Sequence, residues 1–247
     1  MNRPATLFTV AFLQAVNDWQ RGGDENQNRR RGVVLRSQCL SLLAKYRESP
    51  LVCHRQIALP KGGVWDLLGE GKLTEKVSSW TLDLEVAKDF KGGVPPKDQG
   101  FQGAIFSLAP PPGSVIVNIS LLYRDPEFLE AVQLHKEDIV SFHRGIGLYG
   151  DRQREVVLEI DRLSQEDIYS LGGHSSQFEE LVQFAAGEIY GRSPTEDERT
   201  ALILKSDGIR SRAGPTWLTP ESTKRVLARV RPAAEILAEI KRNQSGA

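Results

Sequence analysis

Strand-forming segments cluster in the middle of this chain, and this restricts its fold more than any other feature of the sequence. The runs typical of β-strands are "LVCHRQIAL", "KVSSWT", "GAIFSLA", "SVIVNIS" and "REVVLEI", all between residues 51 and 160. Segments rich in glycine and proline separate them, among them "KGGVPPKDQGFQG" and "APPPGS". Because the strands cluster between helical ends instead of alternating regularly with helices, the sequence predicts an α+β fold.

Both ends of the chain have helical character. Near the N-terminus, apolar residues at helical spacing predict an amphipathic helix capped by Thr6, and "RGGDENQNRRRG" predicts a polar surface loop after it. Near the C-terminus, "SQFEELVQFAAGEIYG" predicts a helix that ends at Gly191, and the next helical stretch is interrupted by Pro232.

These changes in character divide the chain into three predicted segments. They are an N-terminal helical segment at residues 1–50, a β-rich core at residues 51–160 and a C-terminal helical segment at residues 161–247. The flanking helices are candidates for recognising a target, for binding a neutralising protein or for bracing the core. The sequence does not separate these three roles.

Charge and cysteine content exclude several classes of protein. The 32 basic and 32 acidic residues cancel, so the chain is not built as a bulk binder of nucleic acid or membrane, although a local patch is compatible with this balance. The two cysteines do not make a disulfide framework, and no run approaches the ~20 apolar residues that span a bilayer. We therefore expect a cytoplasmic protein without a membrane partner.

Familiar metal and nucleotide motifs are missing from the sequence. The four histidines show no metal-ligand spacing, and the two cysteines do not form a CxxC pair. The "GIG" at residues 145–147 lacks the third glycine and the following helix of a dinucleotide fingerprint. We expect no metal site. The triplet Arg29–Arg31 has the chemistry to contact phosphate, but a solvated basic loop is the interpretation that we favour.

Five polar residues stand out in the predicted strands. Arg55 interrupts "LVCHRQIAL", Ser79 and Thr81 lie in "VSSWT", and Gln153 and Glu155 lie two apart where "QREVVLEI" begins. Because alternate residues of a strand share a face, we expect Gln153 and Glu155 to point to the same side. Taken singly, each residue is better explained as part of an ordinary strand surface, so the argument depends on their order and context.

One stretch, "SSWTLDLEVAKDF", passes from strand to helix. It opens with hydroxyl side chains around Trp80 and then places Leu82, Val86 and Phe90 at spacings of four, which is one face of a helix. Asp83 is the predicted N-cap where strand and helix meet.

In this order and context the sequence resembles the arginine–serine–glutamate branch of the ADP-ribosyltransferase superfamily, toxin-like enzymes that split NAD. The family pattern is an arginine on the first core strand, a Ser-Thr-Ser strand leading into a helix, and a Glu/Gln-x-Glu pair on a later strand. Here "HRQIAL" supplies Arg55, "SWTLDLEVAKDF" supplies Ser79 and Thr81, and "QREVVLEI" supplies Gln153 and Glu155. The tryptophan after Ser79 and the glutamine after Arg55 depart from the pattern.

The resemblance implies a mixed β-sheet core of ADP-ribosyltransferase type, flanked by N- and C-terminal helices, with NAD as co-substrate and no metal. Glu155 is then the catalytic carboxylate that stabilises the charge developing on the ribose. Ser79 orients it, Thr81 supports the strand end, and the guanidinium of Arg55 binds the pyrophosphate. The segment "KGGVPPKDQGFQG" resembles the family's loop over the phosphates and nicotinamide, and a plain connection explains it equally well.

Two further residues bear on the acceptor. Family members with glutamine at the position of Gln153 modify asparagine in proteins or guanine in nucleic acid, because an amide offers a donor and an acceptor but no charge. The segment "RGIGLYGD" resembles the family's target-recognition loop, with Tyr149 exposed for stacking on a base or packing on a protein.

We therefore expect a toxin- or effector-like enzyme that transfers ADP-ribose from NAD to a macromolecule, with a slight preference for a nucleobase over a protein amide. An NAD glycohydrolase and a non-catalytic nucleotide-binding or interaction domain are the alternatives.

Overall fold

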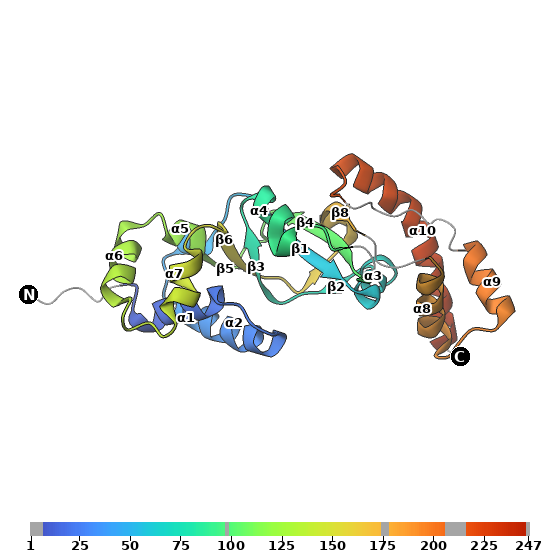
Figure 1. Ribbon diagram of the computed structural model, residues 1–247, viewed down its shortest axis with the longest axis horizontal. Coiled ribbons are helices and arrows are strands. Elements are labelled where there is room, and N and C mark those ends of the chain that lie inside the picture. Colours follow the sequence, from blue (N-terminus) through green and yellow to red (C-terminus); the bar gives the residue numbers. More distant parts are fainter. Residues whose placement is uncertain (1–6, 97–98, 174–177, 206–215, 246–247) are drawn as a thin grey trace, which may run out of the picture. The chain divides into compact units, whose positions relative to one another are not determined.

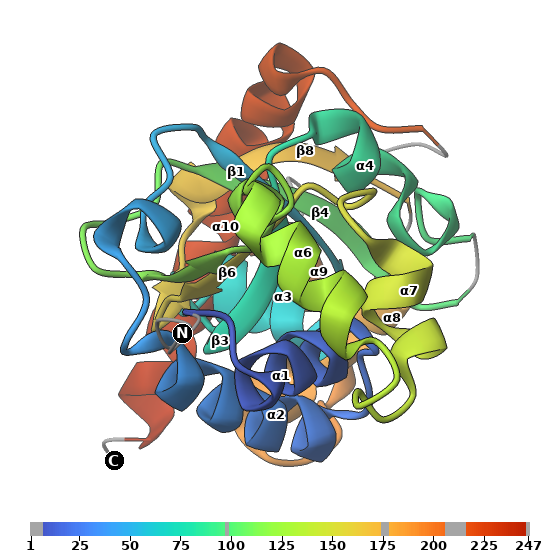
Figure 2. The ribbon, with the colours of Figure 1, turned by 90° about the vertical axis from the view of Figure 1, so that its left-hand side faces the viewer.

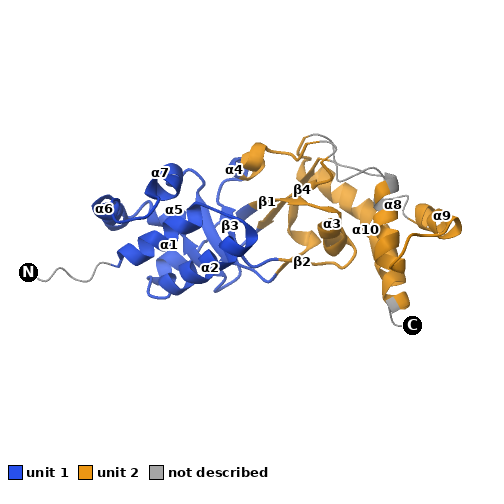
Figure 3. Cartoon of the chain, turned by 60° about the horizontal axis from the view of Figure 1, so that its bottom comes forward, with its two compact units in different colours: residues 1–54, 75–86, 108–161 blue, residues 55–74, 87–107, 162–247 orange. Residues whose placement is uncertain are grey.

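The computed structural model describes residues 7–96, 99–173, 178–205 and 216–245. The chain divides into two compact units that alternate along the sequence (Figure 3). The first unit comprises residues 1–54, 75–86 and 108–161, and the second comprises residues 55–74, 87–107 and 162–247. The β-rich centre of the chain is therefore shared between the two units, with the N-terminal helices in the first and the C-terminal helices in the second.

Two helices, α1 (Val10–Gln20) and α2 (Glu25–Cys39), open the first unit and pack side by side (Figures 1 and 2). The N-cap of α1 is Thr9, and its Oγ1 accepts a hydrogen bond from the Phe12 N–H at 3.2 Å. The helix therefore begins later than the expected cap at Thr6, and Thr6 itself lies outside the described residues.

Helix α2 replaces most of the surface loop that was expected at residues 21–32, so that prediction is wrong. Asp24 accepts a hydrogen bond from the Gln27 N–H at 2.8 Å, and the Gln27 side chain accepts one from the Asp24 N–H at 3.2 Å. This capping box satisfies two N–H groups at the start of the helix. Only one narrow stripe of α2, formed by Gly32, Leu35 and Cys39, is buried, which is why the segment shows so little apolar periodicity.

Three antiparallel strands of the first unit pair in the order β5 (Val115–Asn118), β6 (Glu155–Glu159) and β3 (Val77–Thr81). β1 (Cys53–Leu59) continues the order beyond β3, through the antiparallel pair of His54 with Thr81. The shorter elements of this unit are η1 (Ala44–Arg47), α5 (Ile119–Leu122), α6 (Pro126–His135), η3 (Phe142–Arg144) and α7 (Ile146–Tyr149).

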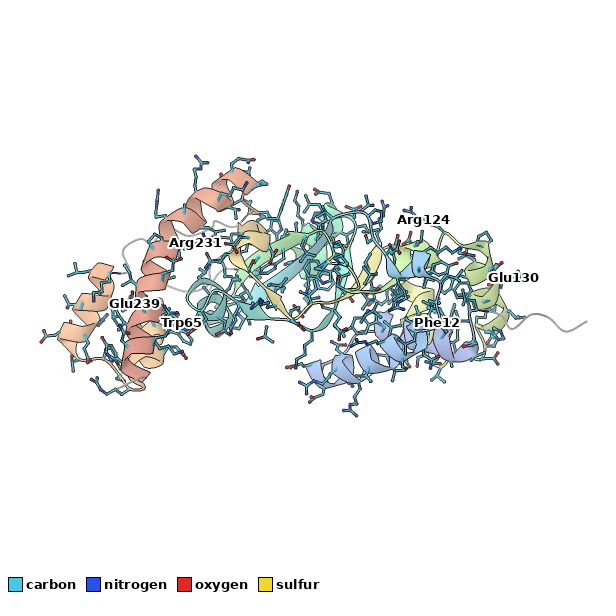
Figure 4. The ribbon with its side chains drawn as sticks, turned by 180° about the vertical axis from the view of Figure 1, so that it is seen from behind. Phe12, Trp65, Arg124, Glu130, Arg231 and Glu239 are labelled. Atoms are coloured by element: carbon cyan, nitrogen blue, oxygen red, sulfur yellow. The ribbon has the colours of Figure 1, made fainter. Side chains whose placement is uncertain are left out.

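An aromatic cluster lies in the core of the first unit. The ring of Phe8 stands edge-on to Tyr46 and Phe128, at centroid distances of 5.7 and 5.3 Å. Phe12 on α1 packs in the same cluster (Figure 4). Apolar residues of β5, β6 and α5 complete this core, so α1 is held by burial against the strands and is more than a peripheral flank.

The second unit has its own core. It contains most of β4 (Gln102–Leu108), which pairs antiparallel with β8 (Ile168–Gly172), and the short pair of β2 (Leu73–Thr74) with β7 (Arg162–Leu163). Trp65 of α3 (Lys61–Leu68) packs with apolar side chains of three C-terminal helices (Figure 4). These helices are α8 (Phe178–Tyr190), α9 (Glu196–Lys205) and α10 (Pro220–Ser245).

Hydrogen-bonded strands follow the order β5-β6-β3-β1-β4-β8, and this arrangement with helices confirms the predicted α+β class. A mixed sheet was expected. The pairs β1–β3, β3–β6, β4–β8 and β5–β6 are instead all antiparallel. β8 lies beyond residue 160, so the strands extend past the predicted end of the core. In the part of the chain that the structure describes, no helix is both long and apolar enough to cross a membrane.

Three helix boundaries bear on the sequence-based expectations. α8 ends before Gly191, whose φ of 65° lies in the left-handed region, as predicted. α10 runs through Pro232 without ending there, because buried side chains on both sides, such as Val230 and Leu237, hold it by packing. α4 (Leu84–Asp89) ends before Phe90, whose side chain is exposed and not buried as its spacing suggested.

Asn17 ties α1 to the segment that leads into α7. Its Nδ2 donates to the Val140 carbonyl at 3.1 Å, its Oδ1 accepts from the Ile146 N–H at 3.0 Å, and its side chain is fully buried. We expect Asn17→Ala to lower the free energy of unfolding by about 1–3 kcal/mol, because the buried Ile146 N–H loses its partner. Urea unfolding measures this loss.

Gln14 provides the matched control for this prediction. Gln14 also bonds to the backbone of Val140, because its Oε1 accepts from the Val140 N–H at 2.8 Å. This hydrogen bond is exposed, so water can replace the Gln14 side chain. Gln14→Ala should therefore change the free energy of unfolding by less than about 0.5 kcal/mol. Equal losses for the two variants would contradict the role assigned to Asn17.

Candidate active site

Glu155 and Ser79 form a hydrogen-bonded pair in the first unit. Glu155 is the first residue of β6 and its Cα pairs with Thr81 on β3, which places Ser79 diagonally opposite on the same face. The Ser79 hydroxyl donates to Oε1 of Glu155 at 2.5 Å. Glu155 is only 3% exposed, whereas Ser79 is exposed, so the pair reaches from the interior of the unit to its surface.

Trp19 is a third member of this cluster, and no sequence motif predicted its part in the site. Its indole Nε1–H donates to Oε1 of Glu155 at 2.9 Å and to the hydroxyl oxygen of Ser79 at 3.0 Å. Trp19 lies in the last turn of α1, and its spacing from Val16 and Phe12 predicts burial. Its role as a hydrogen-bond donor depends on how α1 packs against the strands, which no local pattern specifies.

The two oxygens of the Glu155 carboxyl differ in their surroundings. Oε1 accepts both hydrogen bonds, while Oε2 is buried and has no hydrogen-bond partner among the described residues. Burial raises the pKa of Glu155, and the side-chain donors of Ser79, Trp19 and Gln20 offset part of that rise. A buried carboxyl with one unpartnered oxygen is typical of a functional site, because structure alone does not require it.

A second chain of hydrogen bonds runs beside this cluster. The Tyr123 hydroxyl donates to Oε1 of Gln20 at 3.2 Å, and the Gln20 Nε2 donates to the Gly150 carbonyl at 3.1 Å. Burial and the nearby charge of Glu155 raise the pKa of Tyr123, so its hydroxyl stays a neutral donor. Gln20 therefore connects the end of α1 to the turn that precedes β6.

The hydroxyl side chains of β3 have three different roles. Ser78 points to the opposite face, where its oxygen accepts from the Trp80 indole N–H at 3.0 Å. The Thr81 hydroxyl oxygen accepts from the Asp83 N–H at 3.0 Å, so Thr81 shapes the turn into α4. Asp83 in turn accepts from the Glu85 N–H at 3.0 Å, which confirms the predicted N-cap. Ser79 is thus the hydroxyl of this strand that serves Glu155.

Gln153 is not on the strand that carries Glu155, so the expectation of a shared strand face is wrong. β6 begins only at Glu155, and Gln153 lies in a turn closed by the Arg154 N–H, which donates to the Asp151 carbonyl at 3.0 Å. The φ of Arg154 is +45°, in the left-handed region, and this breaks the alternation of side chains. Tyr149, expected to be exposed in a loop, ends the short helix α7 and is half-buried.

Arg55 and its neighbour His54 lie in β1. The structure brings Ser79, Thr81 and Glu155 together in the first unit, whereas Arg55 is half-buried in the second. His54 belongs to the first unit, where it pairs with Thr81. Burial lowers the pKa of His54, with the charge of Asp83 opposing the shift, so the imidazole is mostly neutral at pH 7.

Comparisons with protein-family models, with curated proteins and with solved structures find no match to this chain. The resemblance carried by Arg55, Ser79 and Glu155 therefore stays a prediction. The geometry by itself describes a carboxylate held by a hydroxyl and an indole N–H. Such an arrangement can stabilise a positive charge that develops next to it.

The raised pKa of Glu155 predicts a pH-dependent cost in stability. A carboxyl whose pKa is higher in the folded than in the unfolded state favours folding when protonated, and that contribution is lost as pH rises through its folded pKa. We expect Glu155→Gln to unfold at a higher urea concentration than the parent at pH 8. The gain should shrink as the pH falls and vanish below about pH 4, where the carboxyl is protonated in both states.

Glu159→Gln is the control for this measurement. Glu159 ends the same strand, but it reaches solvent and forms an ion pair with Arg36 at 2.5 Å. Its replacement should give no gain in stability at pH 8. If Glu155→Gln were destabilising at pH 8 and neutral at pH 4, the carboxylate would be a stabilising structural charge.

Proposed function

We propose that this protein is an NAD-dependent mono-ADP-ribosyltransferase, which transfers ADP-ribose from NAD to a macromolecular acceptor and releases nicotinamide. The observation that carries the proposal is the hydrogen bond from Ser79 to Glu155 across neighbouring strands. The order of arginine, serine and glutamate along the chain led us to expect these two side chains to act together. Their contact supports the proposal without depending on any other feature of the resemblance.

The chemistry requires a negative charge near the ribose. When the bond between the ribose and the cationic nicotinamide breaks, positive charge develops on the sugar, as in glycoside cleavage. The Glu155 carboxylate can stabilise that charge strongly because its surroundings are largely dry.

The environment of Glu155 also fits a ribose hydroxyl. Ser79 and Trp19 hold Oε1 and thereby fix the orientation of the carboxyl. The other oxygen, Oε2, forms no hydrogen bond to a described residue, although the amide of Gln20 lies near enough to the carboxyl to lower its pKa. We assign this oxygen to a ribose hydroxyl of NAD. The resemblance assigns the pyrophosphate to Arg55, whose guanidinium suits a dianion.

Access to Glu155 is limited in this structure. The carboxyl is 3% exposed and the indole of Trp19, itself 6% exposed, lies directly against it. The exposed side of the cluster is at Ser79. We infer that NAD approaches from the Ser79 side and that the neighbouring side chains adjust when it binds.

Glu155→Gln should abolish activity while the fold survives. The amide keeps the shape and accepts the bonds of Ser79 and Trp19, but it removes the charge that opposes the developing cation. We expect the rate of nicotinamide release to fall by about 10²–10³-fold or more. The assay uses labelled NAD with a cell lysate, and later treatment with protease or nuclease identifies the acceptor class.

Glu159→Gln serves again as control, because it removes a charge from the same strand at the surface and should keep full activity. Near-normal turnover by folded Glu155→Gln protein would remove the centre of this proposal. Nicotinamide release that is equally fast with and without a macromolecule, and leaves no label on it, would identify an NAD glycohydrolase instead.

Gln153 and Tyr149 are the residues that we place on the acceptor side. Both lie in the segment before β6. The positive φ of Arg154 turns the side chain of Gln153 away from the strand face that carries Glu155. Gln153→Ala should therefore lower transfer to the macromolecule by more than it lowers NAD hydrolysis. Parallel assays of both reactions test this, and an equal loss in both would show that Gln153 does not act on the acceptor.

A further inference from the structure

A cavity of about 340 Å³ lies at the junction of α1, α2 and η3 in the first unit, and three arginines line it. They are Arg21 at the end of α1, Arg31 on α2 and Arg144 on η3, and the rest of the lining is Gly22, Gly23 and Gln27. One of these cations is neutralised, because Arg21 forms an ion pair with Asp18 at 2.8 Å.

Arg31 is the most informative residue of this cavity. Its Nη1 is buried and has no hydrogen-bond partner within the described ranges of the chain. A guanidinium nitrogen that is removed from water without a partner costs free energy, so an unmet donor next to a cavity indicates a missing acceptor. A solvated loop was expected for Arg29–Arg31, but Arg31 belongs to α2 and lines this cavity.

The backbone keeps the cavity open on one side. Gly22 has a φ of +62°, which L side chains rarely adopt. At Gly23, an added Cβ would collide with Oε1 of Gln27 and would lie 2.9 Å from Nη1 of Arg31, so a side chain there would displace both of these groups. The glycine at position 23 thus leaves room for the guanidinium of Arg31 at the wall of the cavity.

Short stretches of chain connect the cavity to the elements of the proposed function. The last two residues of α1 and its C-cap follow one another in the chain. Trp19 bonds to Glu155, Gln20 bonds to the Gly150 carbonyl, and Arg21 lines the cavity. Arg144 belongs to the same segment as Tyr149 and Gln153, the residues that we placed on the acceptor side. An acceptor that contacts Arg144 would follow this segment of the chain toward the turn before β6.

We propose that this arginine cavity binds a backbone phosphate of a single-stranded nucleic-acid acceptor and thereby holds a base next to Gln153 and Glu155. The identification of this strand as the acceptor rests on the proposed function. Guanidinium groups bind phosphate oxygens through paired N–H donors, and Arg31 and Arg144 supply two such groups. The chain has no net charge, so it is not built for non-specific binding of nucleic acid. A local pair of cations is enough for a few phosphate contacts.

The test measures binding of a fluorescent single-stranded RNA oligonucleotide to the full chain by anisotropy, without NAD. Arg31→Gln and Arg144→Gln should each weaken binding by about tenfold, since each removes a hydrogen bond between charged groups. Each should also reduce the slope of log affinity against log salt by about 0.7, the value for one phosphate contact on a single strand. Arg144 is exposed, so its variant folds even if Arg31→Gln does not.

Arg29→Gln is the matched control, because it removes the same charge from the same triplet. In the parent protein, Arg29 pairs with Glu25 at the surface and does not line the cavity. It should keep the affinity within about twofold of the parent. The proposal is overturned if the parent does not bind RNA, if all three variants weaken binding equally, or if Arg31→Gln and Arg144→Gln weaken only the binding of ADP-ribose or inorganic phosphate. Because no NAD is present, these results are separate from a failure of NAD cleavage, which would overturn the proposed function itself.

Discussion

The shared hydrogen bonding of one carboxylate oxygen organises the first unit. Oε1 of Glu155 on β6 accepts from the Ser79 hydroxyl on β3 and from the Trp19 indole on α1, so a helix and two strands meet at one buried atom. Burying a carboxyl costs free energy, which raises the pKa of Glu155, and its hydrogen-bond donors offset only part of that rise. A site that is expensive to fold and leaves Oε2 unpartnered is better explained by function than by stability.

Helix α1 is the element through which this constraint spreads. Asn17, Trp19 and Gln20 lie in its last two turns and bond, respectively, to the backbone near α7, to Glu155 and to the turn before β6. The apolar residues of the same helix meet the aromatic core. A change in the position of α1 would therefore alter the carboxylate and the proposed acceptor side together, and this gives the N-terminal helices a direct part in the site.

Sequence predicted the elements that are specified locally. β-Branched and apolar runs identified β1, β3, β4, β5 and β6, and the Asp83 cap and Gly191 stop were confirmed because each acts on its own neighbours. β8 was missed because "IYSLG" is short and ends in glycine, and α2 was missed because only one stripe of it is buried. The contact of Trp19 with Glu155 depends on tertiary packing, and the positive φ of Arg154 ended a strand that alternation alone would have continued to Gln153.

The pH dependence of nicotinamide release from NAD tests the central claim, that the ionised Glu155 carboxylate drives cleavage. The rate should fall on the acid side above the pH at which an ordinary glutamate titrates, because burial raises the pKa of Glu155. In Trp19→Phe, which loses the indole donor but keeps an aromatic ring, that fall should move to still higher pH, since one hydrogen bond to the charged form is gone. Release of nicotinamide with the same pH profile in parent, Trp19→Phe and Glu155→Gln proteins would contradict the account.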